Sequence, residues 1–344
     1  MSKWVTVFMA VILSLSLVSG AYAATSAADF YKNKTLVIIV PTKPGGGTDY
    51  GARVIARFWP EFTGGSVVIK NVVGGQGLVG SNRVWHSKPN GLTIGIATTG
   101  AHVTGHVLNK SPGVAFDVTK FGWIGAHQPT PQALAVSAKK PFTSFNDLKQ
   151  QQGLKQCSES PGNIGALYGA LILDHIGAKD AQIVTGFGGS NELGLALGRG
   201  EVDYFIWSCT VVKLHMDKGW VKPPFLAMER KRSAFFPDVP TIFEVMKFSP
   251  EVEKEFDALE RMGSDKSVFA PPGVPKDRLE FLRTTYDKIM SNEKALAQLQ
   301  KRWEIWTGHY SGEKVAANMM QLEETGRIVE RAKKLVEKYA GLKK

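Results

Sequence analysis

A buried strand, a glycine-rich turn and a helix follow one another directly near the start of the chain. Residues 36–40 are all apolar, the turn reads Pro44-Gly45-Gly46-Gly47-Thr48-Asp49, and residues 52–59 have helical spacing. This order points backbone N–H groups and the positive end of a helix at one place, which is a common geometry for binding an anion. Thr48 adds a hydroxyl, and Asp49 is placed to cap the helix. The stretch predicts an α/β unit with a candidate anion site, and an ordinary turn remains the alternative.

The same pattern recurs, which predicts a parallel sheet with crossover helices. Residues 66–70 and 92–97 form the next two apolar runs, and Thr98, Thr99 and Gly100 follow the second of them. Ligands of such sheets bind at the carboxyl ends of the strands. We therefore expect Thr98 and Thr99 to face the same crevice as the glycine turn.

A second parallel sheet is predicted further along the chain. Strands are expected at 156–157, 182–186 and 202–207, and two turns, 158–165 and 187–192, lead into helices. Ser160 or Asn163 is placed to cap the first of these helices and to present N–H groups to a ligand. Small polar residues thus follow the strands of both predicted sheets.

Motifs that mark other protein classes are incomplete or absent in this sequence. Gly75, Gly77 and Gly80 match the spacing of a dinucleotide fingerprint, but no acidic residue follows until Asp117, whereas the fingerprint requires one about twenty residues on. His102 and His106 are four residues apart, but the sequence suggests no further ligands that would complete a metal site with them. No Gly-x-Ser-x-Gly elbow is present, and the histidines suggest no catalytic triad. We expect no metal, no cofactor and no catalysis.

The charge of the chain favours an anionic small ligand over nucleic acid. The formal net charge is +11, but the basic residues are scattered along the sequence. No acidic residue occurs between Glu61 and Asp117, a region that contains Lys70, Arg83, Lys88 and Lys110. An acid-poor segment next to a glycine turn suits a ligand of negative charge.

The first residues predict export. Lys3 begins a short basic region, residues 5–18 are apolar, and Ala21-Tyr22-Ala23 matches a signal-peptidase site. We expect cleavage after Ala23 and a soluble periplasmic protein. Cys157 and Cys209 are the two cysteines. Each lies at the end of a predicted strand, and either a disulfide or two buried thiols remains open.

The rest of the chain completes the predicted architecture. Residues 247–266 are charged and predict a surface excursion, and residues 268–275 predict a strand that returns to the first sheet. Helices are expected at 276–289, 292–302 and 312–340, the last of them one continuous amphipathic helix.

Taken together, these segments resemble the substrate-binding receptors of tripartite tricarboxylate transporters, also called Bug-type receptors. The matching motifs span the mature chain in order: Pro44 to Asp49 with Ala52-Arg53, residues 67–80, Lys88-Pro89-Asn90-Gly91-Leu92-Thr93, Gly200-x-Val202-Asp203, Pro237-Asp238-Val239-Pro240-Thr241 and Ala270-Pro271-x-Gly273-x-Pro275.

The resemblance implies an α/β fold of the type 2 periplasmic-binding-protein kind, with two lobes, a cleft between them and two hinge crossings. Residues 24–130 and 265–344 would form lobe 1, and residues 131–264 would form lobe 2. It implies a monomer that closes on a small organic carboxylate, aliphatic or aromatic, and delivers it to the membrane subunits of a transporter. A sensor accessory is the nearer alternative, and an exported enzyme is the more distant one.

The resemblance also maps a ligand site onto both lobes. Its residues would be Gly45, Gly46, Gly47, Thr48, Asp49, Thr98, Thr99, Gly100, Ser160, Gly162, Asn163, Phe187, Gly188, Asn191 and Trp207. Compared with the family pattern, the turn at 161–165 lacks a serine run, Phe187 replaces a tyrosine, and Val72-Val73 replaces an Arg-Pro pair. Phe187 and Trp207 would suit an aromatic or apolar acid.

Overall fold

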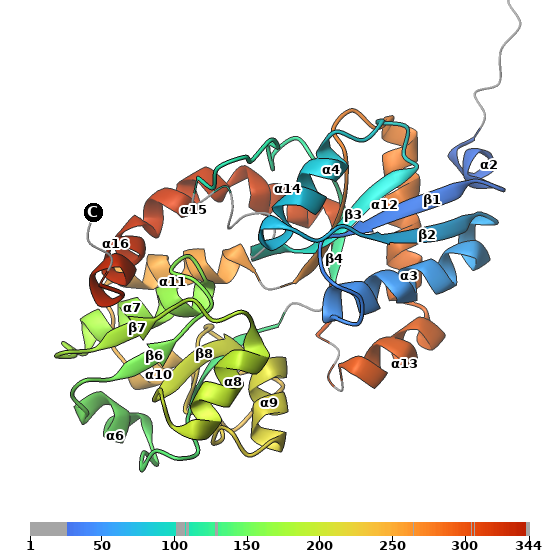
Figure 1. Ribbon diagram of the computed structural model, residues 1–344. Helices are drawn as coiled ribbons and strands as arrows, with labels where there is room; N and C mark the ends of the chain where they lie inside the picture. Colours follow the sequence, from blue (N-terminus) through green and yellow to red (C-terminus); the bar gives the residue numbers. More distant parts are fainter. Residues whose placement is uncertain are drawn as a thin grey trace, which may run out of the picture.

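The computed structural model describes residues 26–100, 107, 110–127, 130–263, 265–303, 305 and 307–341. The predicted signal peptide and the pair His102 and His106 lie outside these residues. Two sheets, each covered by helices, form two lobes (Figure 1). Within the described residues, no helix is both long enough and apolar enough to cross a membrane.

The first sheet has the strand order β11-β4-β10-β3-β1-β2. Its central strands β1 (Thr35–Val40) and β3 (Thr93–Thr98) are parallel to each other, and β2 (Ser66–Asn71) pairs with β1. β10 (Lys266–Ala270) lies antiparallel between β3 and β4 (Gly122–His127), and β11 (His309–Ser311) forms the edge. The expected return strand is thus confirmed, and it makes the sheet mixed rather than fully parallel.

Helices cover both faces of this sheet because each has an apolar stripe to bury. They are α2 (Ala27–Tyr31), α3 (Gly47–Thr63), α4 (Leu78–Trp85), α12 (Lys276–Met290) and α13 (Glu293–Arg302). In place of a dinucleotide loop, a short turn of helix, Gly75–Gly77, leads into α4. The helix α3 buries Val54, Ile55 and Phe58 against Ile38 and Ile94 of the sheet core.

The second sheet has the order β7-β6-β8-β5-β9, and it is mixed rather than parallel as predicted, because β5 lies antiparallel between β8 and β9. Its strands are β5 (Gln132–Val136), β6 (Lys155–Cys157), β7 (Gln182–Val184), β8 (Tyr204–Ser208) and β9 (Leu226–Ala227). Around them lie α6 (Phe145–Gln150), α7 (Ile164–His175), α8 (Ser190–Arg199), α9 (Cys209–Asp217), α10 (Ile242–Val245) and α11 (Pro250–Met262). Nearly every residue of α7 is buried, so this helix forms the centre of the lobe's core.

The C-terminal segment differs from the sequence expectation in two ways. The single helix predicted over 312–340 is three helices, α14 (Gly312–Met320), α15 (Leu322–Ile328) and α16 (Glu330–Tyr339), because the backbone leaves helical geometry at Gln321 and Val329. The chain also returns to the second lobe: α14 contacts β4, whereas α15 packs on α11 and α16 on α7. Residues 265–344 therefore do not all stay with the first sheet.

Two contacts explain why the C-terminal helix crosses over. Ala332, Val336 and Tyr339 of α16 are buried in the apolar cluster of the second lobe. Arg331 bridges Asp174 at 2.7 Å and Glu255 at 3.2 Å. Burial of this apolar stripe stabilises the packing more than an ion pair on a half-exposed arginine does.

The segment 247–266 is not the surface excursion expected from its charge. Its helix α11 buries Phe256, Leu259 and Met262 in the core of the second lobe. Its last residue, Lys266, begins β10 inside the first sheet. The charged residues of α11 occupy one face of an amphipathic helix, which is why composition alone misassigned the segment.

Cys157 and Cys209 lie in the same lobe, as predicted. Both are buried in one apolar cluster and both are free thiols. The structure thus has the thiol alternative rather than the disulfide.

Candidate functional site

The glycine turn ends at the first turn of α3, and its glycines have different roles. Gly45 has a φ of +87°, a conformation that side chains disfavour, so this position requires glycine. Gly46 is the N-cap residue of α3, with a φ of −75° and a ψ of 169° that any residue adopts. The nearest atom to a Cβ built on Gly46 would be 3.8 Å away. The fold therefore tolerates a side chain at Gly46, and a need for glycine there would come from a ligand.

Asp49 holds the turn in place. Its carboxylate accepts hydrogen bonds from the backbone N–H of Gly45 at 2.9 Å, from Asn71 at 2.9 Å and from Arg53 at 2.7 Å. Burial raises the pKa of Asp49, but these donors outweigh it and lower the pKa overall. The side chain is only 1% exposed. Asp49 thus orders the turn from behind rather than presenting an oxygen to solvent.

Of the three residues at the end of β3, Thr98 contacts the glycine turn, whereas Thr99 and Gly100 have other neighbours. The hydroxyls of Thr48 and Thr98 are 3.3 Å apart. Thr99 is buried and donates to Asp265, with the hydroxyl of Ser267 at 2.5 Å. A Cβ on Gly100 would be 2.5 Å from the carbonyl oxygen of Gly263. Thr99 and Gly100 therefore fix the crossing between the lobes.

A lysine that sequence analysis missed lies behind the turn. A Cβ built on Gly47 would be 3.9 Å from Cε of Lys266 and 3.5 Å from the ring of Trp303. Burial lowers the pKa of Lys266 to about 8, against the attraction of Asp265. Burial, with the charges of Lys266 and His309, lowers the pKa of the adjacent His127 to about 3. A mostly protonated lysine and a neutral histidine thus flank the start of α3 at neutral pH.

In the second lobe, the first predicted turn leads into the N-terminus of α7. Asn163 caps the helix by accepting from the N–H of Gly165 at 2.9 Å, as one of the two expected caps. Ser160 and Gly162 are half-buried in the same turn. A Cβ on Gly165 would be 2.1 Å from the carbonyl oxygen of Ile206, so glycine is required where α7 meets β8.

The second predicted turn is more exposed. Gly188 and Asn191 lie at the surface, and the N–H of Gly188 donates to Glu192 at 2.6 Å. Phe187 and Trp207 are half-buried and pack on the apolar cluster that contains both cysteines. Part of each ring is thus buried against the core of the second lobe.

An acidic side chain lies between these two turns. The carboxyl group of Glu159 accepts from Asn163 at 3.5 Å, and its Oε1 would be 3.8 Å from a Cβ on Gly189. Burial raises the pKa of Glu159, and the bond from Asn163 opposes the shift. The sequence pattern of an anion site does not indicate Glu159, because such a site is recognised by N–H donors and cations rather than by a carboxyl group.

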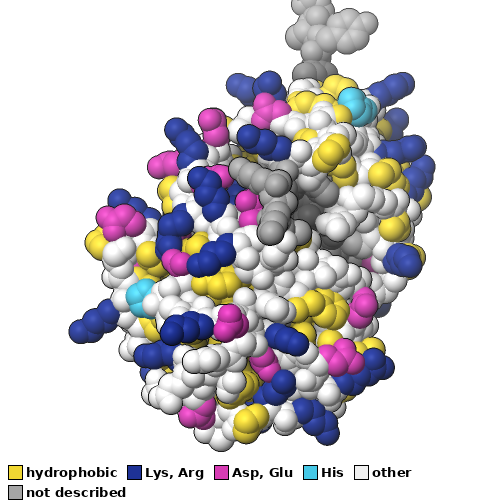
Figure 2. All heavy atoms as spheres, turned by 60° about the vertical axis from the view of Figure 1, so that its left-hand side comes forward, with side chains coloured by type: hydrophobic (Ala, Val, Ile, Leu, Met, Phe, Trp, Pro, Cys, Tyr) yellow, Lys and Arg dark blue, Asp and Glu magenta, His cyan; other side chains and the backbone are white. Residues whose placement is uncertain are grey.

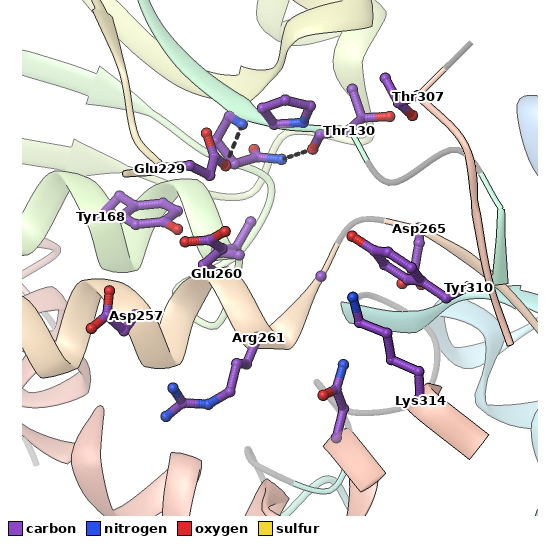
Figure 3. Close-up of a pocket in the computed structure, with 15 residues that line it drawn as sticks. Thr130, Tyr168, Glu229, Asp257, Glu260, Arg261, Asp265, Thr307, Tyr310 and Lys314 are labelled. Atoms are coloured by element: carbon purple, nitrogen blue, oxygen red, sulfur yellow. Dashed lines mark hydrogen bonds between the residues drawn. The ribbon is translucent and has the colours of Figure 1, made fainter. Parts of the chain in front are cut away.

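A separate pocket of about 540 Å³, here called the interlobe pocket, contains none of the residues predicted from the sequence (Figure 3). From the first lobe, Asp265, Tyr310, Lys314 and Asn318 line it, and Thr307 lies beside them. The crossings and the second lobe add Thr130, Pro131, Gln132, Ile164, Tyr168, Glu229, Asp257, Glu260, Arg261 and Gly263.

Other binding chemistries receive no support from the described residues. Among them, no three His, Cys, Asp or Glu side chains are grouped to hold a metal ion. On the face shown in Figure 2, Lys and Arg side chains are interspersed with Asp and Glu rather than gathered into one basic surface.

Comparison with known proteins gives a consistent result. A family model described as "Tripartite tricarboxylate transporter family receptor" matches residues 51–334. Protein BugT of Bordetella pertussis is 26% identical over 246 residues, which cover 68% of this chain and 72% of BugT. These matches extend through both lobes.

Two solved structures share the fold. A TctC solute binding protein from Polaromonas superposes with a TM-score of 0.67 at 21% identity, covering 90% of this chain and 99% of that one. A protein from R. palustris solved with adipate gives a TM-score of 0.65 at 25% identity, covering 90% and 97%. The predicted two-lobed, type 2 periplasmic-binding-protein-like fold is confirmed.

Proposed function

The chain belongs to the tripartite tricarboxylate transporter receptor family, and from this we propose that it is a periplasmic receptor for a small organic carboxylate. The ligand would bind between the lobes and be delivered to the membrane subunits of a transporter. The division into lobes that we propose follows the two sheets, with α15 and α16 assigned to the second lobe. Adipate in the R. palustris relative supports a carboxylate as the ligand class.

The observation that carries this proposal is the combination of the glycine turn with Lys266. The first N–H groups of α3 have no acceptor within the helix, and the helix dipole favours negative charge at this end. Lys266 adds a positive charge behind Gly47. We assign the carboxylate to Gly46, Gly47 and Thr48, with Thr98 beside them, whereas Gly45, whose N–H donates to Asp49, shapes the turn.

The second lobe would complete the site when the lobes close. The N-terminus of α7, with Ser160, Gly162 and Asn163, supplies a second set of N–H groups, and Phe187, Gly188, Asn191 and Trp207 border it. Asp49, Thr99 and Gly100 act as supports in this scheme, because the contacts of Asp49 and Thr99 and the backbone crowding at Gly100 are internal. A ligand that contacts both lobes only in the closed state shifts the equilibrium toward closure.

A carboxylate panel tests the proposal. Malate, adipate and benzoate would be screened by thermal shift, and hits would be titrated calorimetrically beside their neutral amides. We expect one or more acids to bind saturably and the matched amides to bind at least about tenfold more weakly, because they lack the charge. Equal binding of acid and amide would contradict an anion site.

The export and delivery steps need separate tests. Mass spectrometry of exported material should show a chain that begins at Ala24, in agreement with cleavage after Ala23. Uptake of the bound acid by cells that lack this receptor should fall, whereas a sensor accessory would leave uptake intact and change a transcriptional response.

A further inference from the structure

At one corner of the interlobe pocket lie buried side-chain oxygen atoms that have no hydrogen-bond partner among the described residues. Tyr168 of α7 is fully buried, and within the described part of the chain its hydroxyl has no hydrogen-bond partner. The same is true of Oε2 of Glu229, whereas its Oε1 accepts from the N–H of Gln132 at 2.7 Å. In Figure 3 the Tyr168 hydroxyl lies beside the carboxyl group of Glu260, with the side chain of Glu229 above them.

Electrostatic effects agree with this convergence. Burial raises the pKa of Tyr168 well above its ordinary value, and the negative charges of Glu229 and Glu260 raise it further. Burial and the charge of Glu260 likewise raise the pKa of Glu229, to about 8. Buried polar groups are normally paired, and each unpaired one is costly. This corner is therefore suited to a partner that is positively charged and donates hydrogen bonds.

We propose that the interlobe pocket binds a small molecule carrying a primary ammonium group, which donates to Tyr168, Glu229 and Glu260. An ammonium supplies three donors and one compact positive charge, which matches three converging oxygens. The volume of about 540 Å³ suits a small ligand.

The charges around the pocket favour this ligand over an anion or a metal. Four carboxyl groups, of Glu229, Asp257, Glu260 and Asp265, line it against two cations, Arg261 and Lys314. The ammonium of Lys314 lies 3.9 Å from the ring centre of Tyr310, on the first-lobe side. No metal-binding group of side chains occurs among the described residues.

This site differs from the proposed carboxylate site and meets it only at Ile164, the first residue of α7, which lines the pocket. The glycine turn lines no part of it, whereas Pro131 and Gly263 of the crossings do. Because Asp265 and Tyr310 come from one lobe and Tyr168 and Glu229 from the other, an occupant would contact both lobes beside the hinge.

Calorimetric titration of the full mature chain with n-butylamine, beside the isosteric n-butanol, tests the proposal. We expect saturable binding of the amine and at least about tenfold weaker binding of the alcohol. Glu229→Gln preserves the acceptor for the N–H of Gln132 but cannot ionise beside a bound ammonium, and it should weaken amine binding about tenfold or more. Tyr168→Phe removes only the hydroxyl and should weaken it about threefold to tenfold without lowering the melting temperature.

Two control variants make the result specific. Glu251→Gln removes an exposed carboxylate from the same helix as Glu260 and should leave amine binding unchanged. Gly46→Val should also leave it unchanged, because the glycine turn belongs to the other site. The proposal is overturned if the parent shows no saturable binding up to about 10 mM amine. It is equally overturned if Tyr168→Phe and Glu229→Gln both bind as the parent does.

Discussion

At the scale of single residues, the glycine turn is ordered by an aspartate and placed beside a lysine. The sequence predicted Asp49 as a helix cap, but in the structure Gly46 is the N-cap residue, and Asp49 accepts instead from the N–H of Gly45 and from Asn71 of β2. The position of Lys266 beside the turn could not be predicted from the sequence. This residue ends a charged segment, and its place in the sheet depends on β10 pairing between β3 and β4.

Lys266 predicts that carboxylate affinity depends on pH. Its pKa is lowered to about 8, so the side chain is charged at neutral pH and loses its charge as the pH rises through that value. We expect affinity for the best acid of the panel to fall about fivefold to tenfold between about pH 7 and pH 9.

Variants assign this pH dependence to the lysine. Lys266→Met should lower the affinity at pH 7 and flatten the profile, whereas Lys70→Met, which changes an exposed lysine of the same sheet, should keep the profile of the parent. A flat profile in the parent would show that Lys266 does not act on the ligand.

Asp49→Ala is expected to lower the free energy of unfolding by about 3 kcal/mol, since it removes a buried charged acceptor from three donors. The folded-state pKa of Asp49 is lowered, so its stabilising effect is complete at neutral pH and is lost only as the pH falls through that value. Urea denaturation measures the change, with Glu61→Ala, an exposed acid of α3, as the matched control. A loss below about 1 kcal/mol would show that the turn does not depend on Asp49.

At the scale of elements, periodicity predicted which segments form strands and helices better than it predicted their partners. The units from β1 to β3 and from β6 to β8, and the return strand β10, agree with the apolar runs in the sequence. The apolar stripe of α16 was also visible, but a stripe does not identify the surface that it covers. Its partner α7 lies about half the chain away and is recognised only once both are folded.

The docking of α16 predicts a stability effect in the second lobe. Val336 is 1% exposed in that lobe's core, and Val336→Ala should lower the free energy of unfolding by about 2 kcal/mol. Lys334→Ala, on the exposed side of the same helix, should change it by less than about 0.5 kcal/mol. Equal effects of the two substitutions in denaturant titration would mean that the helix is not held by its apolar face.

At the scale of the whole molecule, the chain passes between the two lobes from β4 to β5, from α11 to β10 and again in the C-terminal helices (Figure 1). Sequence motifs spread from Pro44 to Pro275 predicted the two-lobed fold and the family. The interlobe pocket was beyond prediction, since its lining comes from β5, α7, α11 and α14, which no linear motif connects.

This arrangement predicts closure on the ligand. With a saturating carboxylate, small-angle X-ray scattering should give a smaller radius of gyration than without it, because both lobes contact the ligand only when they approach. The neutral amide of the same acid, at the same concentration, is the control. An identical scattering profile with and without the acid would argue for a rigid site.

The most direct test of the account is calorimetric titration of Gly46→Val with the best acid of the panel. The extended backbone at Gly46 and the open space around it allow valine in the folded protein, so circular dichroism and the melting temperature should match the parent. We expect the branched side chain to block the carboxylate and abolish measurable binding, whereas Thr48→Ala, which removes one hydroxyl, should weaken it about threefold to tenfold. If folded Gly46→Val binds the acid as tightly as the parent does, the glycine turn is not the carboxylate site.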